Sequence, residues 1–198
     1  MDVREYLKSN IIVFDGAMGT MLQKKGLQAG DLPECLSITH PDTVLEIHRE
    51  YVLAGADIVT TNTFQACELK LEGSGYSVEE IINAGVSLAK KSGARYTALD
   101  IGPTGQLLEP MGTLSFDKAS ELFKRQMTAG EKAGADLILI ETMSDLYEMK
   151  AAILAAKENT DLPVFATMTY QEDGRTFTGT DPLTGTITLQ SLGADAVG

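Results

Sequence analysis

Short apolar runs alternate with longer amphipathic stretches along the chain, and this pattern predicts strands alternating with helices. The apolar runs end at polar residues, as buried strands do, and they place six strands at residues 11–14, 57–63, 96–101, 136–141, 163–170 and 195–198. The stretches between them repeat apolar residues at spacings of three and four, which predicts helices at residues 3–9, 17–25, 41–55, 77–93, 116–132 and 145–158.

One four-residue pattern recurs where a predicted helix gives way to a predicted strand. It reads Ala54-Gly55-Ala56-Asp57, and it returns as Ala133-Gly134-Ala135-Asp136 and Leu192-Gly193-Ala194-Asp195. A repeat of this kind indicates that one supersecondary unit is reused. In each copy we expect the glycine to end the helix in the left-handed conformation and the aspartate to open the strand. Ser77 and Glu80 have the spacing of a capping box at a helix start.

This alternation predicts βαβ units around a parallel sheet, and therefore an α/β fold. Each strand is followed by a helix, and no Gly-x-Gly-x-x-Gly run follows residues 11–14, so the pattern favours a (β/α)8 TIM barrel over a doubly wound sheet. Such a barrel takes about 250 residues. We therefore expect residues 1–198 to form one barrel domain, present through about strand 6 and incomplete at its C-terminus. An open sheet edge would favour self-association.

Charge and composition narrow the class of protein. A net charge of -12 and an isoelectric point near 4.5 argue against nucleic acid as a partner, because phosphates would be repelled. No apolar run reaches the roughly 18 residues of a membrane span, and the N-terminus lacks the apolar core of a secretory signal. Two cysteines give no disulfide framework, so we expect a cytoplasmic protein with no membrane partner.

Polar residues follow the predicted strands at their carboxyl ends, where barrel enzymes place their active sites. These residues are Asp15-Gly16, Thr61-Asn62-Thr63, Asp100-Ile101-Gly102, Glu141-Thr142 and Met168-Thr169-Tyr170. Carboxylates such as Asp15 and Glu141 can hold an ammonium group, and the backbone N–H groups from Ala17 to Thr20 suit a carboxylate, so the set fits a small zwitterion. A phosphate cradle is the alternative, but the turn lacks the Gly-Lys-Ser/Thr ending of a P-loop and a nearby arginine.

Five motifs together resemble the homocysteine S-methyltransferase family, and within it the homocysteine-binding barrel of cobalamin-dependent methionine synthase. They are Phe14-Asp-Gly-Ala-Met-Gly-Thr20, Thr60-Thr-Asn-Thr-Phe64, Asp100-Ile-Gly-Pro-Thr-Gly105, Ile140-Glu-Thr142 and Phe177-Thr-Gly-Thr-Asp181. They span the chain in the family's order. The run from Asp100 to Gly105 favours the methionine synthase branch over the betaine-dependent one.

This resemblance implies transfer of a methyl group to the thiol of homocysteine, which forms methionine. In the family a zinc ion held by three cysteines binds that thiol as thiolate. The methyl group would come from methylcobalamin on a separate domain, so the cobalamin- and folate-binding domains of the same enzyme would be partners. The residues that the resemblance places around the amino acid are Asp15, Gly16, Ala17, Asn62, Thr63 and Glu141.

The chain departs from the family pattern at the metal. The family's zinc cysteines follow strands 6 and 8, and neither Cys35 nor Cys67 matches them. We therefore expect no metal ligand and no catalytic residue within residues 1–198, and no activity from this segment alone. A non-catalytic barrel fragment and an enzyme that uses betaine or S-methylmethionine are the alternatives. A Schiff-base aldolase is disfavoured because no strand ends in lysine. His40, His48 and Cys67 have structural interpretations.

Overall fold

The computed structural model describes residues 2–28 and 30–198. Its helices are α1 (Val3–Leu7), α2 (Met18–Lys24), the 3-10 turn η1 (Pro33–Cys35), α3 (Leu36–Thr39), α4 (Pro41–Leu53), α5 (Glu68–Leu71), α6 (Val78–Lys91), α7 (Phe116–Ala133), α8 (Leu146–Asn159) and α9 (Pro182–Ser191). Its strands are β1 (Ile58–Thr60), β2 (Tyr96–Ile101), β3 (Leu137–Met143), β4 (Val164–Met168) and β5 (Ala196–Val197). Within this described part, no helix has the length and apolar character needed to cross a bilayer.

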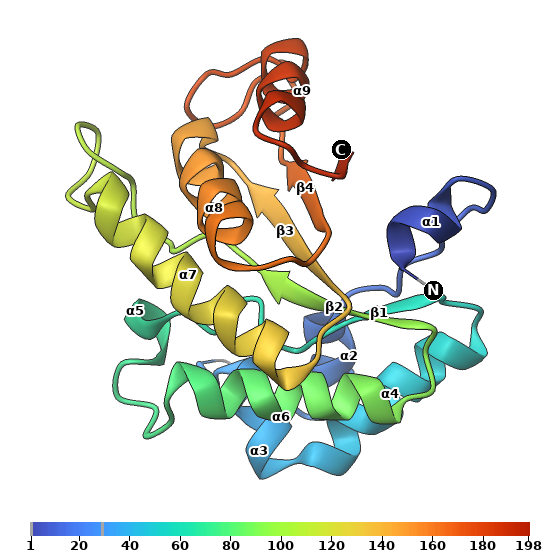
Figure 1. The fold of residues 1–198 in the computed structure, drawn as a ribbon. Helices are drawn as coiled ribbons and strands as arrows, with labels where there is room; N and C mark the ends of the chain where they lie inside the picture. The colour runs from blue at the N-terminus through green and yellow to red at the C-terminus, as the bar shows by residue number, and fades with distance from the viewer. Residues whose placement is uncertain (1, 29) are drawn as a thin grey trace.

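The five strands form one parallel sheet in the order β1-β2-β3-β4-β5, so each strand pairs with its predecessor in the sequence. This arrangement confirms the predicted parallel α/β fold. It also follows the order of a barrel, because a doubly wound sheet reverses its strand order part-way across. Helices α4, α6, α7 and α8 follow one another along one face of the sheet (Figure 1), and the sheet remains open between β1 and β5.

The prediction of a strand at residues 11–14 is wrong. Only Phe14 forms a bridge to the sheet, in parallel with Ile58, while 88% of Ile11 and 52% of Val13 is exposed. The segment has β1 on one side only, so its apolar side chains are not enclosed as those of a buried strand are. The sheet therefore has five strands in the described residues where six were predicted, and β1, β4 and β5 are shorter than the apolar runs that predicted them.

Side chains alternate between the two faces of the sheet, and each face has its own apolar cluster. On the outer face, Leu99, Ile138 and Ile140 belong to the main core that the helices cover. On the inner face lies a smaller group that we call the inner apolar cluster; its buried members are Val3, Ile58, Tyr96, Ala98, Leu137, Leu139 and Phe165. The next inward-facing positions along β2 and β3 are Asp100 and Glu141, so the polar residues lie directly beyond an apolar layer.

Each Gly-Ala-Asp repeat joins the start of a strand to its neighbour through two hydrogen bonds, which we call the aspartate clamp. The backbone N–H of Asp136 donates to the Thr97 carbonyl (2.9 Å), and the Thr97 N–H donates back to the Asp136 carboxylate (2.8 Å). The other two repeats make the same pair of bonds, Asp195 with Val164 (2.7 and 2.8 Å) and Asp57 with Val13 (2.8 and 3.1 Å). The repeat therefore fixes the register between neighbouring chain segments at their amino ends.

Local signals in the sequence set the helix ends. Gly55, Gly134 and Gly193 have φ angles of +107°, +91° and +88°, which confirms the left-handed conformation predicted for the glycine of each repeat. Ser77 and Glu80 form the predicted capping box at the start of α6, and each side chain accepts the backbone N–H of the other residue.

His48 is a neutral core residue. None of its surface is exposed, and neither ring nitrogen bonds to another described residue. Burial lowers the pKa of the ring from 6.5 to about 4, because a charged imidazole would lose its hydration. This environment agrees with the structural interpretation of its place on the apolar side of α4.

We predict that Asp136→Ala lowers the free energy of unfolding by about 1–2 kcal/mol, because the buried Thr97 N–H loses its acceptor. Asp136→Asn keeps an acceptor oxygen and should cost clearly less. Denaturant unfolding of both variants measures the difference. The matched control is Asp161→Ala, an exposed aspartate near the start of β4, which should change stability by no more than about 0.5 kcal/mol. Equal effects of the Ala and Asn variants of Asp136 would contradict the clamp.

His48 should make stability fall as the pH is lowered. Between pH 6.5 and about 4 the unfolded chain takes up a proton on this ring and the folded chain does not, so acidification favours unfolding. The full effect is about 3 kcal/mol. His48→Leu should remove it, and the measurement is the difference in unfolding free energy between the two proteins from pH 8 to pH 4. A difference that does not change with pH would show that the ring binds protons equally in both states.

Candidate active site

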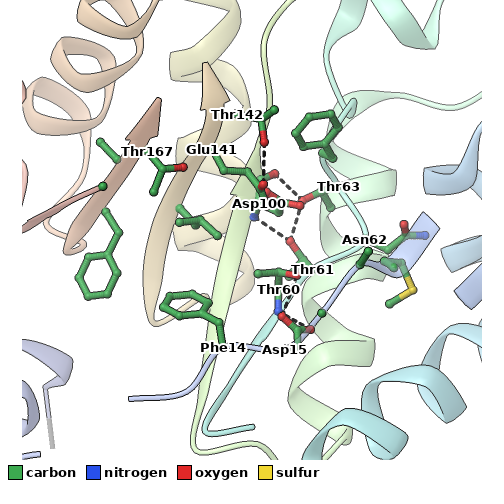
Figure 2. Close-up of a pocket in the computed structure, with 18 of the residues that line it drawn as sticks. Phe14, Asp15, Thr60, Thr61, Asn62, Thr63, Asp100, Glu141, Thr142 and Thr167 are labelled. Atoms are coloured by element: carbon green, nitrogen blue, oxygen red, sulfur yellow. Dashed lines mark hydrogen bonds between the residues drawn. The ribbon is translucent and has the colours of Figure 1, made fainter. Parts of the chain in front are cut away.

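A cavity of about 810 Å³ lies on the inner face of the sheet, at the carboxyl ends of its strands. The turn after Phe14, the loop after β1 and the ends of β2, β3 and β4 all contribute to its wall (Figure 2). Phe14, Leu139 and Phe165 provide apolar surface, and polar side chains lie on the same wall. The polar side chains nearest the strand ends are Asp15, Thr60, Asp100, Glu141 and Thr167.

Two threonines and Asp100 form a closed ring of hydrogen bonds at the ends of β1 and β2 (Figure 2). The Asp100 N–H donates to the Thr61 hydroxyl (3.0 Å), and the Thr63 hydroxyl donates to the Asp100 carbonyl (2.8 Å). The two hydroxyls are 2.6 Å apart, and because the Thr63 proton is already used, Thr61 is the donor between them. All three residues are buried, so the ring holds the Asp100 backbone in one position.

Asp15 follows residues 11–14, which lie beside β1 at the edge of the sheet, and it points toward the end of β1. Its carboxylate accepts the Thr60 N–H (3.0 Å) and the Thr60 hydroxyl (3.1 Å). Burial raises the pKa of Asp15 to about 6, although the bonds from Thr60 oppose the rise, and the charge of Glu141 adds to it. Asp15 therefore changes its charge close to neutral pH.

Glu141 is placed by an irregularity in β3. The register between β3 and β4 shifts between Ile140 and Met143, and Thr142 within the shift has a φ angle of +58°. A β-branched residue in this conformation is strained, and such strain is common at functional sites. The Thr142 hydroxyl donates to the Glu141 carboxylate (2.8 Å), so the shifted segment both positions and hydrogen-bonds this acid.

A second segment, η1 and α3, is attached to the loop after β1. The Asn62 amide donates to the Pro33 carbonyl (2.7 Å) and to the Ser37 hydroxyl (3.2 Å), and the Gln65 N–H donates to Glu34 (2.9 Å). These bonds bring Glu34 into the cavity wall with only 3% of its surface exposed. Burial raises the pKa of Glu34, and its second carboxylate oxygen bonds to no described residue.

The turn from Asp15 to Met18 leaves no room for a side chain at its second residue. A Cβ at Gly16 would lie 2.9 Å from the Tyr51 ring, whose hydroxyl donates to the Ala17 carbonyl (3.2 Å). Gly16 and Ala17 line the cavity, and the side chain of Ala17 provides no cap for α2.

The structure brings together the six residues that the sequence placed around the substrate, since all of them line the one cavity; they are Asp15, Gly16, Ala17, Asn62, Thr63 and Glu141. The side chains of Asn62 and Thr63, however, are occupied by bonds to backbone carbonyls and to the hydroxyls of Ser37 and Thr61. At the end of β4 the prediction of residues 168–170 is wrong, because Met168 points into the main core and Thr167 lines the cavity instead.

Sequence analysis missed Glu34 and Thr60 in the wall. Thr167 was missed because residues 168–170 were predicted to line the cavity at the end of β4. Side chains alternate between the two faces of a strand, so the inward position of Phe165 would have placed the Thr167 side chain inward as well. Glu34 lies in a stretch without periodicity, and no local signal could have found it.

The cysteines and histidines do not form a metal site. Among residues 2–28 and 30–198, no group of three or more His, Cys, Asp and Glu side chains is placed to hold a metal ion. Cys67 is buried in the main core, and burial raises its pKa; Cys35 packs against the edge of the same core. The residues present therefore do not fit the zinc ion that the sequence resemblance implies.

A family model matches nearly the whole chain. The sequence model of the homocysteine S-methyltransferase family matches residues 12–198. Methionine synthase of Mycobacterium tuberculosis is 31% identical over 219 aligned positions that cover 100% of this chain and 18% of that protein. Methionine synthase of Mycobacterium leprae is 30% identical over the same shares. The chain thus spans about a fifth of the length of these relatives.

A solved structure has the same fold. The metallated form of the Escherichia coli homocysteine methyltransferase MmuM superposes with a TM-score of 0.82 and 22% sequence identity, covering 98% of this chain and 75% of that one.

We predict that Thr142→Asn is about 1 kcal/mol more stable to unfolding than Thr142→Val. Asparagine tolerates a positive φ angle, whereas valine keeps the strain of a β-branched residue. Both variants lose the native hydroxyl that bonds Glu141, so this comparison isolates the backbone strain. Thermal and denaturant unfolding measure it, and equal stabilities would mean that the conformation carries no strain.

Proposed function

Because the chain belongs to the homocysteine S-methyltransferase family, we propose that its cavity binds the amino-acid end of L-homocysteine and that the protein methylates the thiol of this substrate to form methionine. The observation that carries the proposal is the set of acidic side chains on the cavity wall, where no described lining residue is basic. A site of this charge selects a ligand with an ammonium group.

Asp15 and Glu141 are proposed to bind the ammonium group. Each already accepts a hydrogen bond from a threonine, which fixes the direction of its carboxylate and leaves lone pairs free for the substrate. The substrate's own carboxylate is proposed to lie against the backbone at Gly16 and Ala17, where a larger residue than glycine would displace Tyr51. Asn62 and Thr63 then act by holding the wall in place.

We assign no step of thiol activation to the described residues, since they provide no metal site. A zinc ion, when bound through ligands elsewhere in the protein, would hold the thiol as thiolate. We propose methylcobalamin on another domain as the methyl donor, because the relatives that match this whole chain are named methionine synthases and extend far beyond it. The cobalamin- and folate-binding domains would then be its partners. We also propose a cytoplasmic location, where Cys35 and Cys67 would remain free thiols.

The choice of donor is tested by supplying the complete natural protein with zinc, L-homocysteine and one methyl donor at a time. We expect methionine to form with methylcobalamin and not with betaine or S-methylmethionine. Residues 1–198 alone should form none. Product with betaine would reassign the donor, and no product with any of the three would overturn the proposed reaction.

The affinity for L-methionine, the proposed product, should show a break in its pH dependence near 6, because protonated Asp15 cannot hold an ammonium group. Below the break the affinity should fall by an additional factor of about ten per pH unit. Asp15→Asn should remove the break and weaken binding by about 10- to 100-fold near neutral pH.

Calorimetric titration from pH 5 to pH 8 measures both effects. The matched control is Asp161→Asn, which removes an exposed carboxylate away from the cavity and should keep the break. Asp15→Asn binding as tightly as the unaltered protein would exclude Asp15 from the ammonium site.

A further inference from the structure

We propose that the empty cavity stores one proton on the carboxyl group of Asp100, and that the ammonium group of the ligand expels this proton to solvent when it binds. The inference rests on the proposed function, in that it takes an amino acid as the ligand. It adds a role for Asp100 and a measurable exchange of protons with the solvent.

Asp100 cannot move away from its neighbours. It lies on β2, between β1 and β3 in the sheet, and its backbone is held by the ring through Thr61 and Thr63. Only 7% of the residue is exposed, and Oδ1 of its carboxyl group bonds to no described residue. In the ionised form, Oδ1 in this position would have neither water nor a donor from the described residues to stabilise its charge.

The charges that face Asp100 are all acidic. Glu141 on β3, Asp15 in the turn after Phe14 and Glu34 in η1 all act on Asp100 with negative charge. The residues that line the cavity in the described part of the chain include no lysine, arginine or histidine. Burial and then the charge of Glu141 hold the pKa of Asp100 well above its usual range. Negative charges around a buried carboxyl group favour its protonated form.

Hydrogen-bond donors distinguish Asp100 from the other acids of the wall. Glu141 is half-buried and accepts the Thr142 hydroxyl. Asp100 has no such donor on Oδ1, so the proton belongs to Asp100. Asp15 accepts two bonds from Thr60 and is ionised above its pKa of about 6.

An ammonium group removes the reason for storing the proton. It brings a positive charge and three N–H donors to a cavity that has neither. Asp100 can then ionise and accept one of these donors, and its proton passes to the solvent. The O–H bond of Asp100 breaks, its proton goes to solvent, and the ligand keeps its own protons. The ammonium charge offsets the new charge on Asp100, and the ligand's own carboxylate leaves the filled cavity one unit more negative than the empty one.

Calorimetric titration of the complete natural protein with L-methionine, near pH 7.5 and in two buffers of different ionisation enthalpy, measures the number of protons released. L-methionine is the probe because it carries the ammonium group but no thiol proton. We expect about one proton per ligand. The analogue 4-(methylthio)butanoate, which lacks the amino group, should release none.

Asp100→Asn cannot store the proton and should release about none. The matched control is Glu148→Gln, which changes another buried carboxyl group, bonded to Thr104 outside the cavity, and should still release about one. Binding of L-methionine to the unaltered protein without proton release would overturn the inference and leave the proposed function intact. Equal release with the analogue would also overturn it.

Absence of binding by both L-methionine and L-homocysteine would instead contradict the proposed function. Carbon-13 NMR of the ligand-free protein then decides the inference on its own, and it also covers the case in which Asp100→Asn does not fold. A carboxyl carbon of Asp100 with the chemical shift of the acid near pH 7.5 supports the stored proton. The shift of a carboxylate overturns it.

Discussion

The aspartate clamp is the interaction on which the rest of the structure depends. Its two hydrogen bonds set the register at the amino ends of neighbouring segments, and the register decides which side chains share a level on the inner face. A slip of one residue would turn Asp100 into the outer core and Leu99 toward the cavity. The chemistry at the carboxyl ends of the strands is thus positioned by bonds at their opposite ends.

The electrostatics of the site result from two layers on the inner face, an apolar layer and a layer of acidic side chains beyond it. The inner apolar cluster lies below the acidic side chains, and burial together with the neighbouring negative charges raises the pKa of Asp100. Local hydrogen bonds offset the cost of this environment. Thr60 donates to the Asp15 carboxylate, and Thr142 donates to the Glu141 carboxylate. Asp100 differs from these two acids, because its Oδ1 receives no hydrogen bond from any residue in the described part of the chain.

The sequence predicted those features that depend on neighbouring residues. The left-handed glycines, the capping box and the parallel order of strands all have local signals, and each is confirmed. The edge segment at residues 11–14 was misread because its composition is that of a buried strand while its position in the sheet is exposed. Glu34 and the charge state of Asp100 depend on contacts between distant segments, which periodicity does not encode.

The clamps also bear on the order in which the chain assembles. In each clamp the partner precedes its aspartate in the sequence, as Thr97 precedes Asp136, so a segment leaving the ribosome meets a partner that has already been made. The partners of the clamps lie 31 to 44 positions apart, so each new segment pairs with the one made just before it. The bond from Arg4 to Asp195 is the exception, because it spans 191 positions. Val3 and Tyr6 of helix α1 already meet β2 through the inner apolar cluster, so the bond to Asp195 completes the docking of this helix only after synthesis has passed β5.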